Sequence, residues 1–373
     1  MTKKLAVLSG KGGSGKTSLS LCIANLLSTC EIKTLLIDCD FSTNGATYFF
    51  ETFLDSSESY YSVKGLINAP FPDEKDNKVI SIHKYFDFIP SVSKIGETPI
   101  DSIDALFFTN DIFNHISKNY DVIIFDCQAG YSDVLKEILT GIDETLFVME
   151  ADTISSASIR SLYLKIGNLL TGKRKSYQVF NKVTSEEYEI YNKISGGTFF
   201  TNIESVLFDW TIRKAFALSQ IPSLEKVSVR FYEQLLNICN VLFAESYYIE
   251  KLNNFSKKII SKKIQEEKFQ LRDKISSLHN INKRKKYRIL TITAVIYIIV
   301  IIVFTNVFFL DKYVCLFELI DKKTVFLLSS AFIGFFGISL LLDMITDLLK
   351  KRNEEIDYKR KLSSLEEDEK NYK

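Results

Sequence analysis

The sequence predicts an α/β fold in which helices cover both faces of a mostly parallel sheet, followed by a charged helical linker and two transmembrane helices. Three observations lead to this prediction. Short apolar runs alternate with longer helical patterns as far as about residue 245. The runs are continuously apolar, which is typical of strands that are buried on both faces. Beyond residue 288, two long stretches carry no charged side chain.

Six apolar runs are the predicted strands of the sheet. Helical patterns separate them, and strands joined by helices pair in parallel through right-handed crossovers. The stretch Phe50–Lys84 is polar and contains Pro70 and Pro72, so we expect loop and short helix there. The strands expected are Leu5–Leu8, Thr34–Ile37, Phe86–Ile89, Val122–Phe125, Thr145–Met149 and Tyr177–Phe180.

The C-terminal third changes character. A charged helical pattern begins near residue 247, and Ile264, Leu271, Ile275 and Leu278 fall on one stripe of it. This stripe predicts either a short coiled-coil seam or a plain amphipathic linker helix. The predicted organisation is a first domain at 1–246, a charged linker at 247–288, a transmembrane hairpin at 289–349 and a charged tail at 350–373, either helical or disordered.

The two uncharged stretches are long enough to span a bilayer. Residues 289–310 and 324–342 contain 22 and 19 residues without a formal charge. About 20 helical residues cross a hydrocarbon core of about 30 Å. Two buried core helices are the alternative, but "IYIIVIIVF" has no polar face. The basic flanks "NKRKKYR" and "KKR" lie at the outer ends, so both termini are expected in the cytoplasm.

The charge distribution and the cysteine and histidine content limit the partners and metal sites that the sequence predicts. The 373-residue chain has a formal charge of +1, but the segment from Glu250 to Arg288 carries 13 Lys and Arg against four Asp and Glu. Such a block indicates anionic lipid or nucleic acid as a partner, or a solvated helix face. Six cysteines without a C-x-x-C pair and three distant histidines give no zinc-site spacing. The N-terminus lacks the apolar core of a signal peptide.

A phosphate-binding loop is predicted between the first strand and the first helix. Residues Gly10–Thr17 fit the pattern G-x-x-x-x-G-K-[ST] in the strand–loop–helix context that this motif requires. Lys16 is expected to reach the β- and γ-phosphates, and Thr17 to ligate Mg²⁺. The residues expected to bind the nucleotide through this loop are Gly12, Gly13, Ser14, Gly15, Lys16, Thr17 and Ser18.

Two further strands end in carboxylates. "TLLIDCD" ends in Asp38 and Asp40, and "DVIIFDC" ends in Asp126, with Gly130 four residues later. The carboxyl ends of parallel strands form the ligand edge of the sheet. We therefore expect these carboxylates beside the loop, with Asp126 holding Mg²⁺ through water. A helix cap is the alternative for a solitary carboxylate.

The motifs resemble those of the ParA/MinD family of deviant-Walker P-loop ATPases. Its signature K-G-G-x-G-K-[ST] corresponds to Lys11–Thr17, and its D-x-D strand end and following Asn correspond to Asp38, Asp40 and Asn44. "VFNKV" is similar to its adenine-contacting strand, with Asn181 as the base-reading residue. The likeness extends over about residues 1–245, where "DWTIRKAFALSQIPSLEK" resembles the family's last block.

The resemblance implies roles for individual residues. Lys11 reaches the phosphates of the other subunit across an ATP-dependent dimer, which ties nucleotide state to dimerisation. Lys16 and Asp40 complete the catalytic set, with Asp40 orienting the attacking water. Asp38 joins Thr17 and Asp126 around Mg²⁺. The cofactors expected are thus ATP and Mg²⁺, and the reaction is a slow, partner-stimulated ATP hydrolysis.

The predicted function is a membrane-anchored ATPase switch that recruits or positions a protein partner. The expected location is the bacterial cytoplasmic membrane, crossed twice. One alternative is an ATP-regulated effector, for example in antiviral defence, whose hairpin oligomerises and perturbs the bilayer. Another is a tyrosine kinase of the bacterial polysaccharide type, but those kinases carry their spans before the nucleotide domain. Nucleic acid is not the favoured partner, because the basic block adjoins the predicted spans.

Overall fold

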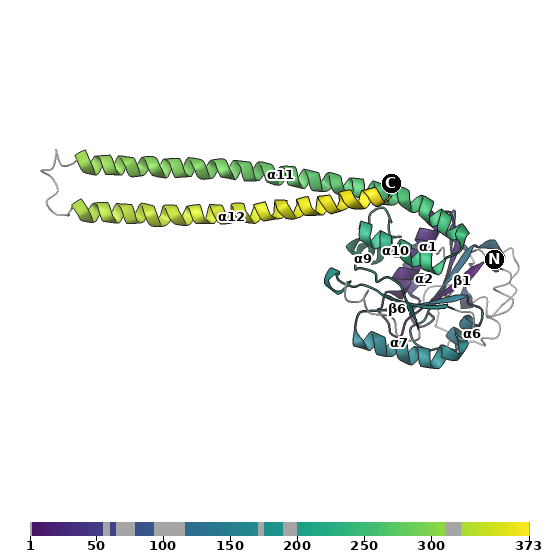
Figure 1. Ribbon diagram of the computed structural model, residues 1–373. Coiled ribbons are helices and arrows are strands. Elements are labelled where there is room, and N and C mark those ends of the chain that lie inside the picture. The colour runs from purple at the N-terminus through teal and green to yellow at the C-terminus, as the bar shows by residue number, and fades with distance from the viewer. Residues whose placement is uncertain are drawn as a thin grey trace. The chain divides into compact units, whose positions relative to one another are not determined.

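The computed structural model divides the chain into two units, Met1–Ile260 and Ser261–Lys373 (Figure 1). It describes residues 2–54, 60–64, 79–92, 116–170, 175–188, 200–309 and 322–372. The first unit ends 14 residues beyond the predicted domain boundary at 246, because it includes the start of a helix that begins at Ser246. Each unit is described separately below.

The first unit is built on a sheet of eight described strands in the order β3-β4-β2-β5-β1-β6-β7-β8. All neighbouring pairs are parallel except β3 and β4, which are antiparallel. β1 lies between β5 and β6, so the loop that follows β1 emerges at the middle of the sheet. The strands are β1 (Lys3–Leu8), β2 (Thr34–Cys39), β3 (Ile80–His83), β4 (Phe86–Ile89), β5 (Val122–Cys127), β6 (Glu144–Met149), β7 (Lys175–Phe180) and β8 (Thr201–Asn202).

All six predicted strands are confirmed, with ends extended by up to two residues. The prediction of loop and short helix for Phe50–Lys84 is wrong at β3, which forms a strand because it folds back against β4 as an edge hairpin. Much of that stretch, residues 55–59 and 65–78, lies outside the described part of the chain. The parallel α/β architecture predicted from the sequence is therefore confirmed for the first unit.

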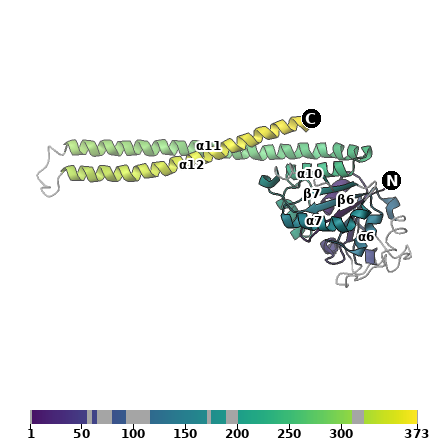
Figure 2. The same cartoon turned by 60° about the horizontal axis from the view of Figure 1, so that its bottom comes forward.

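Helices cover both faces of this sheet. Figure 1 shows α1 and α10 on one side of the sheet and α6 and α7 on the other, and Figure 2 shows α10, α6 and α7 from a second direction. Side chains cap several N-termini: Asp152 accepts from the N–H of Ser155 at the start of α7, and Ser228 accepts from Phe231 at α10. The helices are α1 (Lys16–Thr29), α2 (Gly45–Phe49), α6 (Asp133–Thr140), α7 (Thr153–Ile166), α9 (Trp210–Ala217) and α10 (Val229–Leu242), with short 3₁₀ turns at Glu51–Phe53, Ser117–Asn119 and Gly167–Leu169.

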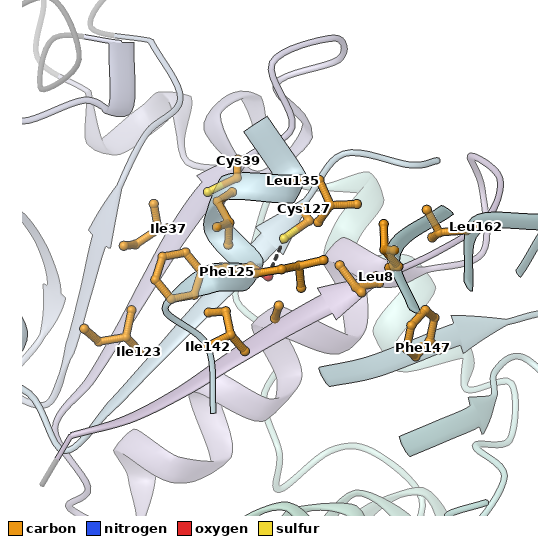
Figure 3. Close-up of a cluster of buried hydrophobic side chains, with 14 of the residues drawn as sticks. Leu8, Ile37, Cys39, Ile123, Phe125, Cys127, Leu135, Ile142, Phe147 and Leu162 are labelled. Atoms are coloured by element: carbon orange, nitrogen blue, oxygen red, sulfur yellow. Dashed lines mark hydrogen bonds between the residues drawn. The ribbon is translucent and has the colours of Figure 1, made fainter. Parts of the chain in front are cut away.

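A buried cluster joins the sheet to α6 and α7 (Figure 3). Phe125 and Phe147 from the strands pack with Leu135 of α6 and Leu162 of α7, and all four are buried. Cysteines belong to the core as well. The five described ones are buried and free, namely Cys22, Cys30, Cys39, Cys127 and Cys239. The burial of these side chains holds the strand ends, and with them the loops at the ligand edge, in fixed positions.

Two long helices dominate the second unit. α11 (Ser246–Phe309) contributes its part from residue 261 onward, and α12 is Lys322–Tyr372. They run antiparallel, because Arg272 pairs with Glu366 at 3.1 Å and Asn282 with Glu355 at 2.9 Å. The predicted stripe faces inward at Ile264 and Leu271, which are buried. The tail after residue 350 is helical, one of the two outcomes that the sequence left open.

No helix in the described part of the chain has the length and apolarity that crossing a membrane requires. The predicted connection 311–323 lies mostly outside the described residues, as do most side chains of the two predicted spans, 289–310 and 324–342.

Candidate nucleotide-binding site

The loop between β1 and α1 turns at two glycines in the left-handed region. Gly13 and Gly15 have φ angles of 84° and 83°, which glycine adopts without strain. Gly15 is also the N-cap of α1, so the positive end of the helix faces the loop. A Cβ added at Gly12 or Gly13 would meet no atom within 4 Å. The backbone here is open to an approaching anion, as the motif predicts.

Lys16 lies between two of the predicted carboxylates. Its Nζ is 3.8 Å from Oδ2 of Asp40 and 3.6 Å from Oδ1 of Asp126. The side chain is buried, and burial alone would lower its pKa. Asp126 and Asp40 more than offset that effect, so the pKa of Lys16 is raised and the ammonium stays charged. The structure therefore brings together three residues that the sequence assigned to one site.

Asp126 is the carboxylate best placed for a metal ion. It is paired in register with Val7 of β1 and Asp38 of β2, and it is fully buried. Ser20 donates to its Oδ1 at 3.3 Å, whereas Oδ2 has no hydrogen-bond partner among the described residues. Burial raises the pKa of this carboxyl despite the opposing effect of Lys16. A further cation nearby would stabilise the charged form of Asp126.

The residues present fit a magnesium–nucleotide complex. The buried Oγ of Ser14 in the loop is also without a partner among the described residues. A carboxylate oxygen and a hydroxyl are hard oxygen donors of the kind that Mg²⁺ prefers. No group of three or more His, Cys, Asp or Glu forms a closed metal site within the described ranges.

Asp38 has a different environment from the one expected. Its Oδ1 accepts from the N–H of Asp40 at 3.0 Å, and its Oδ2 accepts from the N–H and hydroxyl of Thr47 at 2.8 and 2.7 Å. Burial, followed by the charge of Asp126, raises its pKa to about 7. These bonds anchor the turn that carries Asp40, and the assignment of Asp38 to the Mg²⁺ shell stays a prediction.

Asp40 is oriented by the turn that follows β2. Its Oδ1 accepts from the hydroxyl and N–H of Ser42 at 2.7 and 3.2 Å and from the N–H of Thr43 at 3.1 Å. Its Oδ2 faces Lys16. Asn44, in a left-handed conformation at φ 49°, begins α2 and accepts from the hydroxyl of Ser91 at 2.7 Å. One oxygen of Asp40 is therefore fixed by the turn, and the other points into the site.

Lys11 is paired with acids of its own chain. Its Nζ lies 3.1 Å from Asp152 and 3.3 Å from Glu150. The hydrogen bond to Asp152 is the main cause of a raised pKa for Lys11. Sequence reasoning missed both acids, although they follow a strand that neighbours β1 in the sheet. The predicted contact of Lys11 with a second subunit stays a prediction.

Asn181 follows β7 and borders an apolar pocket beside the loop. Its Nδ2 donates to the carbonyl of Ser14 at 2.9 Å. Ser18 of α1 and the ring of Phe231 also line this pocket, which suits a flat heterocycle such as a nucleotide base. The other apolar lining residues include Leu19, Cys22, Leu207 and Ile212.

The first part of the chain is similar to a known protein family and to solved structures. Residues 2–179 match a family model described as an AAA domain. The MinD cell division protein of Aquifex aeolicus superposes with a TM-score of 0.52 at 19% identity, over 66% of this chain and 98% of that one. The matched part of the chain has the fold of MinD.

Two further proteins are similar to the chain. A protein assigned to plasmid partition in Borrelia burgdorferi, bound to AMPPNP, superposes with a TM-score of 0.51 at 18% identity, over 65% of this chain and 99% of that one. An uncharacterized ATP-binding protein of Methanocaldococcus jannaschii is 22% identical over 50% of this chain and 77% of its own length. At these identities the structural matches show a shared fold.

Proposed function

We propose that the chain is an ATPase of the ParA/MinD type that acts at a membrane as a nucleotide-dependent switch. The observation that carries this proposal is the position of Lys16, held between Asp40 and Asp126 at the opening of a glycine-rich loop. In the proposed exchange, the ammonium of Lys16 leaves the two carboxylates and binds a phosphate when nucleotide and Mg²⁺ enter. The Mg²⁺ then replaces the ammonium as the cation beside the carboxylates.

The residues of the chain divide the work of the reaction. The N–H groups of the loop and Lys16 bind the phosphates, while Thr17 and Asp126 hold Mg²⁺, which would neutralise charge that develops on them. By resemblance to the family, Asp40 accepts a hydrogen bond from the attacking water through Oδ2, the oxygen that faces Lys16. Asn181 and the apolar pocket hold the base.

Lys16→Ala tests the nucleotide site. The variant should lose measurable ATP binding, because the loop loses the ammonium inside it while two buried carboxylates lose their cation. Isothermal calorimetry with MgATP measures this, and Lys258→Ala, an exposed lysine outside the site, is the control. Micromolar affinity retained in the Lys16→Ala chain would refute the assignment.

The switch is proposed to work through ATP-dependent dimerisation. Lys11 is one third exposed on a loop that is open at Gly12 and Gly13, so a second copy of the chain can approach it. Its two acids then act as the resting partner that the phosphates of the other subunit replace. Dimer formation would thus require a nucleotide charge large enough to compete with Glu150 and Asp152.

Membrane attachment through 289–310 and 324–342 completes the proposal. It is supported by the uncharged sequence and by large apolar side chains that are exposed on α11, such as Leu290 at 57% and Tyr297 at 68%. Exposed basic residues border both stretches, including Arg288 and Lys350, and these favour an anionic inner leaflet. We propose the bacterial cytoplasmic membrane, with both termini inside and a protein partner recruited there.

A further inference from the structure

Asn181 and Lys182, the two residues that follow β7, donate hydrogen bonds to backbone carbonyls of the phosphate loop. Nδ2 of Asn181 donates to the carbonyl of Ser14 at 2.9 Å, and Nζ of Lys182 donates to the carbonyl of Gly13. The approach is close, since a Cβ at Gly15 would lie 2.3 Å from Nδ2 of Asn181 and 3.1 Å from Cε of Lys182. The loop is therefore held from a neighbouring element as well as by its own turn.

Holding these carbonyls fixes the direction of the N–H groups that face the site. In a trans peptide, the C=O of one residue and the N–H of the next point in opposite directions. When the carbonyl of Gly13 points to Lys182, the N–H of Ser14 points away from it, toward the open side of the loop. The same holds for the carbonyl of Ser14 and the N–H of Gly15. A cation on the carbonyl also polarises the peptide and makes its N–H a better donor.

Lys182 is itself held in an uncommon backbone conformation. Its φ of 60° lies in the left-handed region, which disfavours side chains other than glycine. Both of its neighbours are held by backbone hydrogen bonds, because the N–H of Asn181 donates to Met149 at 2.8 Å and that of Val183 to Val206 at 3.1 Å. Strain of this kind persists where the surroundings impose it, often at functional sites.

Glu150 holds the ammonium of Lys182 and links it to the other side of the loop. Its Oε1 lies 3.0 Å from Nζ of Lys182, and its Oε2 lies 3.3 Å from Nζ of Lys11. One carboxylate at the end of β6 thus restrains two lysines, one on the loop and one bound to a loop carbonyl. Both lysines lower the pKa of Glu150 despite partial burial, so it stays ionised at neutral pH.

We propose that Lys182 is a positioning residue of the nucleotide site. Its ammonium holds the Gly13–Ser14 peptide so that the N–H of Ser14 faces the phosphates, and Glu150 keeps the ammonium in place. Asn181 does the same for the next peptide while it borders the base. This inference rests on the proposed function, because it requires that the loop bind phosphates.

Substitutions of Lys182 in the full-length chain test this role. Lys182→Met keeps the length of the side chain but removes the ammonium, and it should weaken MgADP binding about tenfold or more. Because the N–H groups act on the phosphates before and during the reaction alike, KM for ATP should rise while kcat changes little. Lys182→Arg keeps a cation and should restore most of the affinity. Lys258→Met is the matched control and should bind MgADP like the wild type.

Calorimetry, steady-state ATPase rates and thermal denaturation of the four proteins decide the outcome. Affinity for MgADP equal to that of the wild type in Lys182→Met would overturn the proposal. So would a Lys182→Arg variant as weak as Lys182→Met, because the ammonium would then not be the reason. A wild-type chain that binds no MgADP would instead refute the proposed function, and this inference with it.

Discussion

At the scale of single residues, the three carboxylates of the site differ in how many of their oxygens have partners. The carboxylate of Asp126 keeps one oxygen without a described partner, whereas both oxygens of Asp38 are occupied by Asp40 and Thr47. Asp40 lies between these cases, with one oxygen fixed by its turn and the other facing Lys16. Side chains of one type at neighbouring strand ends therefore have different surroundings, which is why we propose different roles for them.

Replacing Asp40 should separate binding from hydrolysis. Asp40→Ala removes a carboxylate near the phosphates, so MgATP should bind at least as tightly, while kcat falls about 10²-fold or more because the water loses its acceptor. Calorimetry and single-turnover hydrolysis measure the two effects. Asp273→Ala, on an exposed position of α11, is the control. Unchanged turnover in Asp40→Ala would assign the role to another residue.

Asp38 should make the stability of the apo chain depend on pH. Its folded pKa of about 7 lies above the unfolded value of about 3.9, so the folded state binds more protons between these limits. The contribution of Asp38 to stability should then be greatest at low pH and fall as pH rises from about 4 to 7, by up to a few kcal/mol at about 1.4 kcal/mol per pKa unit.

Asp38→Asn isolates this effect. The variant cannot ionise, so the difference in unfolding free energy between it and the wild type should shift in favour of the variant as pH rises. Urea titrations between pH 5 and 8 measure that difference, which includes any change in the titration of its neighbour Asp126. A difference that stays constant over this range would contradict the raised pKa.

Sequence reasoning reached the members of the site that belong to motifs. Lys16 and Asp126, which lie together, could be predicted because one begins α1 after the loop that follows β1 and the other lies at the end of β5. The acids that pair with Lys11 and the carbonyl contact of Lys182 could not, because they depend on which strands are neighbours. Strand order places β6 beside β1 and β7 beside β6, and no local pattern records it.

At the scale of elements, strands buried on both faces were the most predictable. β1, β2, β5 and β6 have continuous apolar runs and were found near their observed bounds. β3 and β8 were missed because an edge strand of four residues and one of two carry little periodicity. The amphipathic stripe of α11 indicated its buried face, but its antiparallel partner depended on contacts 62 or more residues away in sequence, such as Lys285 with Asp347.

The loop and α7 are packed backbone against backbone at Gly10. A Cβ there would lie 2.4 Å from the carbonyl carbon of Ser158 and 2.5 Å from the N of Ile159, so one of the two elements must move. Gly10→Ala should therefore destabilise the chain by about 1–3 kcal/mol, as overpacking does. For a domain of this size the melting temperature should fall by several degrees.

Gly12→Ala provides a matched control for this prediction. The same methyl group at Gly12 meets nothing within 4 Å, so its melting temperature should stay near that of the wild type. Differential scanning calorimetry without nucleotide compares the two chains. Equal melting temperatures for both variants would show that α7 yields easily at this position.

At the scale of the whole molecule, the proposed switch depends on Lys11 leaving its own acids. Lys11→Ala should leave ATP binding by one chain largely intact, since Lys16 and the loop backbone remain. It should weaken ATP-dependent dimerisation, because the lysine gains a phosphate only across an interface. Crosslinking of Asp40→Ala, with and without Lys11→Ala, measures this in a slowly hydrolysing background.

Membrane attachment should change the concentration at which dimers form. Confinement to a bilayer raises effective concentration, so the full-length chain in vesicles should dimerise at lower protein than a chain ending at residue 260. If the Lys11→Ala, Asp40→Ala double variant dimerises as readily as Asp40→Ala in both settings, the cross-subunit role is wrong. Dye leakage from the same vesicles with ATP would favour the effector alternative.

Because the five described cysteines are buried, the folded chain should react slowly with thiol reagents, and this low reactivity can be used to follow its opening. Each is at most 3% exposed, and burial raises the pKa of the Cys22 and Cys30 thiols to about 12. Once Cys315, outside the described residues, is replaced by Ser, a thiol-reactive dye can label the native protein only through opening. Cys22 lines the apolar pocket beside the phosphate loop, so its labelling rate measures how often that pocket opens and how strongly added nucleotide slows the opening.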